Sequence, residues 1–333
     1  MSPLPAHKDH YPNDYSACSG CSLCLLVCPV WRQKRDLRHT SQGRAKAFQH
    51  GARPEDIGDA LFSCAMCGSC NTICPEGIDL KGILASLRRD IKDGRVAAII
   101  KKLISNNNRP PMDIPKGKAV FLPGINLGDS RERIERITAL LGHGKGIFIA
   151  DYDGWDIGLA FEAGVDMPVG RLERFLDSLR GVRHIVVGDG IMKRVLRMHL
   201  PKVKVTGVGE ELSSLDVVKN SLLPTDLYVI ESRSYNIDFE KLSRHYDRLR
   251  NDCRCAFNLD LHMAAVPTTA TSMHRLLDME GVDSREQARW ILKGRDVKRI
   301  VVESMEDGRA FMDVTDIPVV HLADIVDDSR GGI

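Results

Sequence analysis

Eight of the ten cysteines in this 333-residue chain lie between positions 18 and 74, in two runs of identical spacing. The first run has cysteines at 18, 21, 24 and 28 followed by Pro29, and the second has them at 64, 67, 70 and 74 followed by Pro75. A secreted disulfide scaffold spreads its cysteines through a small domain and follows a signal sequence. Neither feature is found here, so the clustered thiols indicate metal binding.

The spacing C-x2-C-x2-C-x3-C-P indicates which metal. It is the pattern of bacterial two-cluster ferredoxins, in which the fourth cysteine serves the other [4Fe–4S] cluster. Three cysteines at i, i+3 and i+6 wrap three corners of a cube, and the fourth thiolate must come from another direction. We therefore predict two clusters with crossed ligands. Cluster 1 is assigned to Cys18, Cys21, Cys24 and Cys74, and cluster 2 to Cys64, Cys67, Cys70 and Cys28.

Two other metal or redox hypotheses fit the spacing less well. Tetrahedral zinc prefers two C-x2-C pairs to two triplets that each end in C-P. Separate redox thiols of the C-x-x-C type lack the third and fourth cysteines.

The segments around the cysteines have helical patterns. Short helices are expected at 44–48 and 54–62, and apolar residues recur at helical spacing from Leu80 to Ile104. We predict an α-helical ferredoxin with two [4Fe–4S] clusters over residues 1–104. The polar segment 105–118 contains three prolines and is expected to be a linker.

The remainder alternates short apolar strands with helical segments, which indicates an α/β domain with a largely parallel sheet. Strands are expected at 119–122, 147–150, 184–187, 202–205, 227–230, 299–302 and 317–322, and helices at 134–141, 168–179 and 191–200. The strand pattern recurs after about 108 to 115 residues, which predicts two copies of one unit at 119–215 and 225–330. The predicted fold class is thus α+β multidomain, with a helical dicluster ferredoxin followed by a duplicated α/β domain.

Composition limits the classes of protein. The chain has 47 Lys and Arg against 45 Asp and Glu, and this near balance argues against a dedicated nucleic-acid binder. Its 43% apolar content excludes a disordered chain, and no apolar run is long enough to span a membrane. The first ten residues contain no apolar segment typical of a signal peptide, so the expected location is the cytoplasm.

With both halves considered, the chain resembles the heterodisulfide reductase family. Its first part is similar to the C-type subunit with two [4Fe–4S] clusters, and its second part to the tandem CCG-type domain of B-type or D-type subunits. Relatives of the glycerol-3-phosphate and lactate oxidation iron–sulfur subunits join these parts in the same order. The resemblance implies partners in a redox complex, namely a flavin-bearing A-type subunit and a catalytic B-type subunit. A membrane cytochrome is an alternative partner, because some relatives deliver electrons to quinone pools.

The CCG-type domain holds a non-cubane cluster through cysteines that this sequence lacks. At the matching positions stand Ile125, Tyr152-Asp153-Gly154, Gly188-Asp189-Gly190-Ile191, Glu231–Ser234 and Glu303–Met305. A cluster cannot be held where its thiolates are missing. We therefore expect a catalytically inactive CCG-like domain that acts as a docking scaffold, and we assign no catalytic residue.

Three smaller features leave alternatives open. Cys253 and Cys255 are expected to be partly buried thiols that act as small hydrophobic residues, with a redox or metal role as the alternative. Gly188–Gly190, between a strand and a helix, forms either a tight turn or an anion site. The basic segment Trp31–His39 either is solvated or docks an acidic face of an electron partner.

The function expected from these observations is an electron-transfer subunit. It would relay electrons through two [4Fe–4S] clusters between a flavin-containing subunit and a catalytic subunit. One alternative is a catalytic oxidoreductase that uses the C-terminal half on a disulfide or organic-acid substrate. Another is an iron–sulfur subunit that serves a membrane cytochrome or quinone pool, and a third is a structural or regulatory subunit whose clusters only stiffen the fold.

Overall fold

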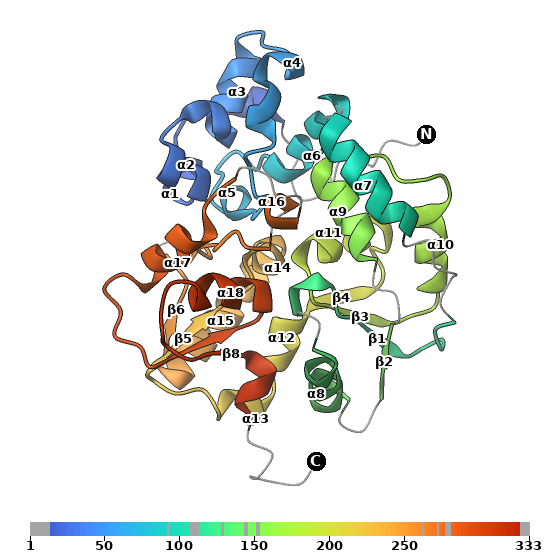
Figure 1. Cartoon of the computed structure of the whole chain (residues 1–333), viewed down its shortest axis with the longest axis vertical. Helices are drawn as coiled ribbons and strands as arrows, with labels where there is room; N and C mark the ends of the chain where they lie inside the picture. The colour runs from blue at the N-terminus through green and yellow to red at the C-terminus, as the bar shows by residue number, and fades with distance from the viewer. Residues whose placement is uncertain are drawn as a thin grey trace.

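The computed structural model describes residues 14–91, 94–106, 113–127, 130–142, 146–150, 154–260, 263–271, 273–276 and 281–326. Its N-terminal part contains only helices within these residues, and two parallel sheets follow (Figure 1). The N-terminal elements are η1 (Tyr15–Ala17), α1 (Leu23–Leu26), α2 (Pro29–Lys34), η2 (Leu37–His39), α3 (Ser41–Gln49), α4 (Pro54–Ile57), η3 (Gly58–Leu61), α5 (Ser69–Thr72), α6 (Leu80–Ile91) and α7 (Gly94–Asn106).

The first sheet and its helices occupy the middle of the chain. Its elements are β1 (Ala119–Leu122), η4 (Ile125–Leu127), α8 (Arg131–Leu141), β2 (Ile147–Ile149), α9 (Trp155–Ala163), α10 (Arg171–Ser178), β3 (His184–Val187), α11 (Gly190–His199), β4 (Lys204–Gly207), α12 (Val208–Leu212) and α13 (Asp216–Lys219). The second sheet follows with β5 (Asp226–Val229), α14 (Ser232–Ile237), α15 (Phe239–Cys253), β6 (Ala256–Phe257), α16 (Met273–Leu276), α17 (Ser284–Leu292), β7 (Arg299–Val302), α18 (Met305–Met312), β8 (Val319–His321) and η5 (Leu322–Ile325).

Both sheets are four-stranded, parallel and identical in strand order. The first has the order β2-β1-β3-β4 and the second β6-β5-β7-β8. Residues 184–187 and 299–302, which match each other in sequence, form the equivalent strands β3 and β7. These runs, HIVV and RIVV, are largely buried, as expected for strands covered on both faces. The predicted combination of helices with parallel sheets is therefore confirmed.

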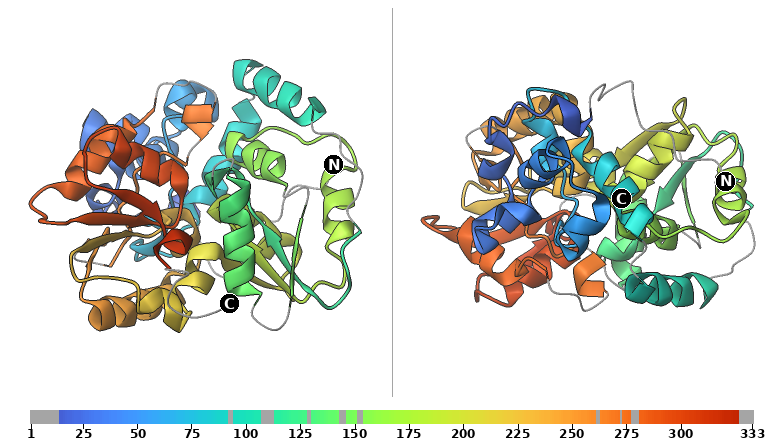
Figure 2. Two further views of the ribbon diagram at one scale, coloured as in Figure 1. Left: turned by 60° about the horizontal axis from the view of Figure 1, so that its bottom comes forward. Right: turned by 90° about the horizontal axis from the view of Figure 1, so that it is seen from above.

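The two sheets face each other through the segments that follow their strands (Figure 2). Helix α11, after β3, contacts α14, which follows β5. In the same way α18, after β7, contacts η4, which follows β1. The C-terminal ends of the strands in both sheets therefore meet at one interface, and the contacts across it are reciprocal.

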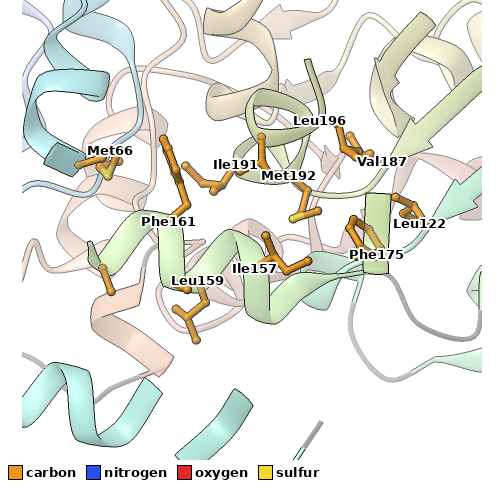
Figure 3. Close-up of a cluster of buried hydrophobic side chains, with 14 of the residues drawn as sticks. Met66, Leu122, Ile157, Leu159, Phe161, Phe175, Val187, Ile191, Met192 and Leu196 are labelled. Carbon is orange, nitrogen blue, oxygen red and sulfur yellow. The ribbon is translucent and has the colours of Figure 1, made fainter. Parts of the chain in front are cut away.

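The N-terminal helices share a core with the first sheet. Helices α6 and α7 both pack on α9. Met66 and Leu84 belong to the same buried cluster as Phe161 and Ile191, and Figure 3 shows Met66 at one end of this cluster beside Phe161. The loop that carries the second cysteine run is thus fixed against the α/β part.

Several predicted elements differ in their limits. The helix predicted at 54–62 becomes α4 and η3, because Gly58 adopts φ +51°. The predicted run 80–104 forms two helices, α6 and α7, and residues 92 and 93 lie outside the described residues. The strand predicted at 202–205 lies two residues later, at Lys204–Gly207. Helix α9 was not predicted, since eight of its nine residues are buried and it has no polar face from which a helical period could be recognised.

The predicted domain boundaries at 104, 119, 215 and 225 remain predictions. Part of the predicted linker, residues 107–112, lies outside the described residues, as do residues 1–13 of the predicted ferredoxin.

Candidate iron–sulfur site

The eight predicted cysteines occupy equivalent places in two similar loops. In the first loop Cys18 follows η1, Cys21 lies in the turn, Cys24 lies in α1 and Cys28 directly precedes α2. In the second loop Cys64 and Cys67 lie outside helices and strands, Cys70 lies in α5, and Cys74 follows that helix. Each loop therefore places its third cysteine in a four-residue helix.

The two loops also share an unusual backbone. The residue before the second cysteine has positive φ in both, at Gly20 (+80°) and Met66 (+50°). The residue after it does too, at Ser22 (+67°) and Gly68 (+84°). A non-glycine residue in this region costs about 1–2 kcal/mol and persists where the surroundings fix it, often at ligand clamps. Two loops of different sequence thus adopt one turn that directs three thiols inward.

Two cavities lie inside these loops, and each is lined by four of the cysteines. One cavity is lined by Cys18, Cys21, Cys24 and Cys74. The other is lined by Cys28, Cys64, Cys67 and Cys70. In both cases the fourth thiol comes from the other loop. We call them the first cavity and the second cavity.

This donor set fits two cubane clusters. A [4Fe–4S] cluster needs one thiolate at each of four iron atoms, and each cavity offers four thiols from two directions. Within the described residues, no three His, Cys, Asp or Glu side chains converge closely enough to hold a single metal ion.

Hydrogen-bond donors reach the sulfur atoms of the second cavity. The Ser41 hydroxyl lies 3.6 Å from the Cys70 Sγ, and the backbone N–H of Met66 lies 3.4 Å from the Cys64 Sγ. Hydrogen bonds to ligand sulfur are among the features that set cluster potentials.

Burial strongly affects these thiols. Desolvation raises the pKa of Cys24 to about 11 and that of Cys28 to about 12, and it also raises the pKa values of Cys67 and Cys70. A coordinating metal deprotonates a thiol outright, because its positive charge compensates the thiolate. Without iron the buried thiols are therefore neutral, and metal binding is what makes them charged ligands.

The second cavity also contains buried cations that the sequence analysis did not single out. Arg44 and Lys81 line it, and they are only 1% and 3% exposed. Arg44 donates to the His39 carbonyl and to the Ser41 hydroxyl. Lys81 Nζ has no hydrogen-bond partner among the described residues, and burial lowers the pKa of this amine to about 8.

Residues of α14 in the α/β part and of α6 in the N-terminal part hold the second loop from outside. Arg233 donates to the Ala65 carbonyl at 2.9 Å and to the Glu162 carboxylate at 2.6 Å. Asn236, also in α14, donates to the Cys67 carbonyl at 2.9 Å. From α6, Arg88 donates to the Cys64 carbonyl at 2.6 Å. No spacing rule indicates such contacts in advance, because they join residues up to 169 positions apart.

The first loop is more open. Cys21 is exposed, and beside it the apolar side chains of Leu23 and Leu26 are 37% and 61% exposed. The two cavities thus differ in environment, since the first lies near the surface and the second lies between the helical and α/β parts.

The positions where the resembled family has further cysteines lie at the meeting edge of the two sheets. Glu303 accepts hydrogen bonds from Tyr228, Tyr246 and the backbone N–H of Glu231, at 2.6–2.8 Å. The Cβ of any larger residue at Gly190 would lie 2.2 Å from the Ser234 backbone nitrogen. Tyr152 and Asp153 lie outside the described residues. Glu231 and Glu303 are thus buried and hydrogen-bonded, whereas Ile125 is 38% exposed. Asp189 caps α11 by accepting from the Ile191 N–H, and Gly190 is the first residue of that helix, so the tight turn and the anion site both stay predictions.

The other two features have clear positions. Cys253 and Cys255 are both buried, more fully than the partly buried thiols predicted, and their sulfur atoms are 3.0 Å apart. The basic segment is only partly solvated: Arg32 donates to Gln287 at 2.8 Å and stacks over Trp290 of the same chain. Arg32 therefore binds α17, whereas Arg35 and Arg38 of the same segment are exposed.

Comparison with known proteins gives the class of the N-terminal part. Residues 14–78, which include all eight cysteines, match the family model described as a 4Fe-4S dicluster domain. The chain thus carries a domain for two [4Fe–4S] clusters, with an iron–sulfur electron-transfer function.

One curated relative adds to this. Over 90 residues the chain is 27% identical to a protein named "Fumarate reductase iron-sulfur subunit" from Mycobacterium tuberculosis (strain CDC 1551 / Oshkosh). The match covers 24% of this chain and 36% of the relative, so the chain spans about a third of that protein's length. No solved structure matches the chain.

Proposed function

We propose that the chain is the electron-transfer iron–sulfur subunit of a larger oxidoreductase complex. Its clusters are held by Cys18, Cys21, Cys24 and Cys74 and by Cys28, Cys64, Cys67 and Cys70. The observation that carries the proposal is the pair of cavities, each lined by three thiols of one loop and the fourth of the other. Crossed ligands connect the loops, so that two redox centres lie next to each other in one small lobe.

The chemistry supplied by such clusters is the uptake and release of single electrons. The protein's own residues hold the thiols in place, exclude water and surround the second site with positive charge. The exposed Leu23 and Leu26 beside Cys21 mark the first site as the place where a redox partner approaches. Within the described residues no helix is long and apolar enough to cross a membrane.

The proposed partners follow from the resemblance to heterodisulfide reductases. They are a flavoprotein of the A type and a catalytic subunit of the B type, with the α/β part of this chain as a CCG-like scaffold. Identical strand orders and reciprocal contacts between the sheets support a duplicated unit. The packed carboxylates at Glu231 and Glu303, which replace thiols, support a scaffold without its own cluster.

The curated relative favours a second candidate. Its name assigns it to a fumarate reductase, so this chain is alternatively an iron–sulfur subunit of an organic-acid reductase that exchanges electrons with a membrane cytochrome or quinone pool. Both candidates share the electron relay and differ in the partner subunits. Purification of the native complex and identification of its other subunits separates them.

The relay itself is tested by metal content and by ligand substitution. Anaerobically purified chain should contain about eight iron and eight sulfide per protein, without stoichiometric flavin. In Cys28→Ser, the cluster held by Cys64, Cys67 and Cys70 should be lost or altered, although Cys28 follows Cys24 in sequence. Cys253→Ser is the matched control, because this buried thiol lies outside both cavities, and it should retain all iron.

The proposal fails if the chain binds zinc, if it holds a single cluster, or if dithionite produces no EPR signal of a reduced cluster. Damage in Cys28→Ser that is confined to the cluster of Cys18, Cys21 and Cys24 would contradict the crossed ligands alone.

A further inference from the structure

The two cavities have the same thiol set but different electrostatic surroundings. Two buried cations, Arg44 and Lys81, line the second cavity. Among the described residues that line the first cavity there is no Lys or Arg; its polar lining consists of Ser19, Ser22, Ser41, Gln42 and Glu76. The first loop also has a lysine beside it, but the ammonium of the half-buried Lys46 lies outside the lining of the first cavity and donates to the Cys18 carbonyl at 3.1 Å and to the Gln49 side chain at 2.8 Å. The difference between the two cavities is therefore that only the second has buried cations in its lining, among the described residues.

Lys81 is the more unusual of the two cations. It lies on the inner face of α6, it is 3% exposed, and its Nζ has no hydrogen-bond partner among the described residues. The nearby carboxylate of Asp79 pairs with Arg194 at 2.6 Å and accepts from Asn71 at 3.1 Å. A buried ammonium without a partner is costly, and native proteins rarely keep one. Its partner must therefore be something that the cavity holds.

The position of the ammonium identifies that partner. Lys81 Nζ lies 2.7 Å from the point where a Cβ would stand on Gly68, the residue that follows Cys67 in the ligand loop. The ammonium is therefore held against the backbone of the ligand loop at the wall of the second cavity. Arg44 differs, because its guanidinium already donates to the His39 carbonyl and the Ser41 hydroxyl.

We propose that Lys81 is a positioning residue that supplies the counter-charge of the second cluster and holds its reduction potential above that of the first. The inference rests on the proposed electron-transfer function. Reduction adds one negative charge, and a fixed positive charge in a poorly solvated site stabilises that charge more than it would in water. Cluster potentials depend on net charge, hydrogen bonds and solvent exposure, and all three differ between the two cavities.

With this difference in potential, electrons pass from the first cluster to the second. The first site, near the exposed Leu26, exchanges electrons with the outside, and the second site, between the helical and α/β parts, retains them. The α/β part secures the second loop through Arg233 and Asn236, so the charged surroundings of this site are rigid and need little reorganisation when the electron arrives.

The test is a redox titration of the full-length chain with both clusters bound, monitored by EPR. The EPR signal of the second cluster is identified as the one that is absent in Cys28→Ser. In Lys81→Met the reduction equilibrium of the second cluster should shift at least ten-fold toward the oxidised form, which is 59 mV for one electron. The first cluster should shift less than three-fold. Lys102→Met is the control, since this exposed lysine of α7 should move neither potential.

A second variant, Lys81→Gln, distinguishes the effect of the charge from the effect of hydrogen bonding. It also replaces Lys81→Met in the titration if that variant does not incorporate its second cluster. Glutamine keeps an N–H donor but no charge, so it should show a shift similar to that of methionine. The inference is overturned if either variant leaves the second potential within two-fold of the wild type, or if both potentials move together. A wild-type chain that lacks two clusters would instead overturn the proposed function.

Discussion

At the scale of single residues, the two ligand loops show how different side chains produce the same turn. Gly20 in one loop corresponds to Met66 in the other, and Ser22 corresponds to Gly68. Glycine adopts positive φ at no steric cost, whereas Ser22 and Met66 are held there by their surroundings. Met66 is fully buried against the core beside Phe161, and this burial stabilises a backbone conformation that the residue itself disfavours.

Gly68 is the position where turn geometry and charge are linked. In Gly68→Ala the new Cβ would lie 2.7 Å from Lys81 Nζ and 3.2 Å from the Asn236 Cβ, so the ammonium must move away. We expect a loss of about 1 kcal/mol in stability from the positive φ and, in addition, a lower potential of the second cluster. Thermal unfolding and an EPR-monitored titration measure the two effects.

The control for this substitution is Gly51→Ala. Gly51 has φ +86°, and no atom lies within 4 Å of its added Cβ, so the variant carries the backbone strain alone. It should lose a similar amount of stability while both potentials stay the same. If the second cluster has the same reduction potential in Gly68→Ala and Gly51→Ala, the position of Lys81 does not affect that potential.

At the scale of elements, helix α14 of the α/β part supports the second ligand loop of the N-terminal part. Helix α14 begins at the end of β5, where Glu231 caps it by accepting from the backbone N–H groups of Arg233 and Ser234. This cap aims the first turn of α14 at the second ligand loop. The Nη2 nitrogen of Arg233 then donates both to the Ala65 carbonyl and to the buried Glu162 carboxylate.

Removal of Arg233 should therefore destabilise the chain and its second cluster together. Arg233→Ala leaves the Glu162 carboxylate without its 2.6 Å ion pair, although the Met273 N–H still donates to it. The loss of one partner of a buried ion pair costs about 3–5 kcal/mol. We expect a large drop in the unfolding midpoint, and iron loss that begins at the second cluster during mild warming.

Arg244→Ala in the adjacent helix α15 is the matched control. Arg244 is exposed, and among the residues that the structure describes it donates to the Glu240 carbonyl of its own helix alone, so its loss should change stability by about 0.5 kcal/mol or less. If the first and second clusters of Arg233→Ala lose iron at the same rate, α14 does not specifically support the second loop.

The elements also show what a sequence can and cannot predict. The cysteine spacing alone predicted a dicluster domain, because ligand identity and spacing are local properties. Strands such as His184–Val187 and Arg299–Val302 were predicted at their exact limits, since short β-branched runs are distinctive. Helix α9 and the contacts of Lys81, Arg233 and Asn236 could not be predicted, because burial on all sides removes periodicity and long-range contacts leave no local pattern.

At the scale of the whole molecule, the two parallel sheets direct the C-terminal ends of their strands at one buried interface. Several carboxyl groups meet there, and burial raises the pKa values of Glu231, Glu303 and Asp307 to about 7. Hydrogen bonds from Tyr228 and Tyr246 to Glu303 compensate only part of the desolvation. These carboxyl groups therefore make the stability of the folded chain depend on pH.

Asp307 gives this dependence a testable sign. Its carboxyl accepts a hydrogen bond from the Thr268 hydroxyl, and its pKa is about 7 in the folded chain against an ordinary value of 3.8. Between these values the folded state binds more protons than the unfolded state. Its contribution to stability is thus present below about pH 4 and is lost as the pH rises through 7, by at most about 1.4 kcal/mol per pH unit.

Asp307→Asn keeps an acceptor for Thr268 but cannot ionise, so it should gain stability relative to the wild type as the pH rises from 5 to 7 and gain no more above 8. Anaerobic urea unfolding of both chains at pH 5, 6, 7 and 8 measures this difference. The exposed Asp313, at the end of the same helix α18, provides the control Asp313→Asn, which should follow the wild type at every pH. A constant difference between Asp307→Asn and the wild type would mean that this carboxyl is already ionised at pH 5, and that the interface between the sheets is more polar than its packing indicates.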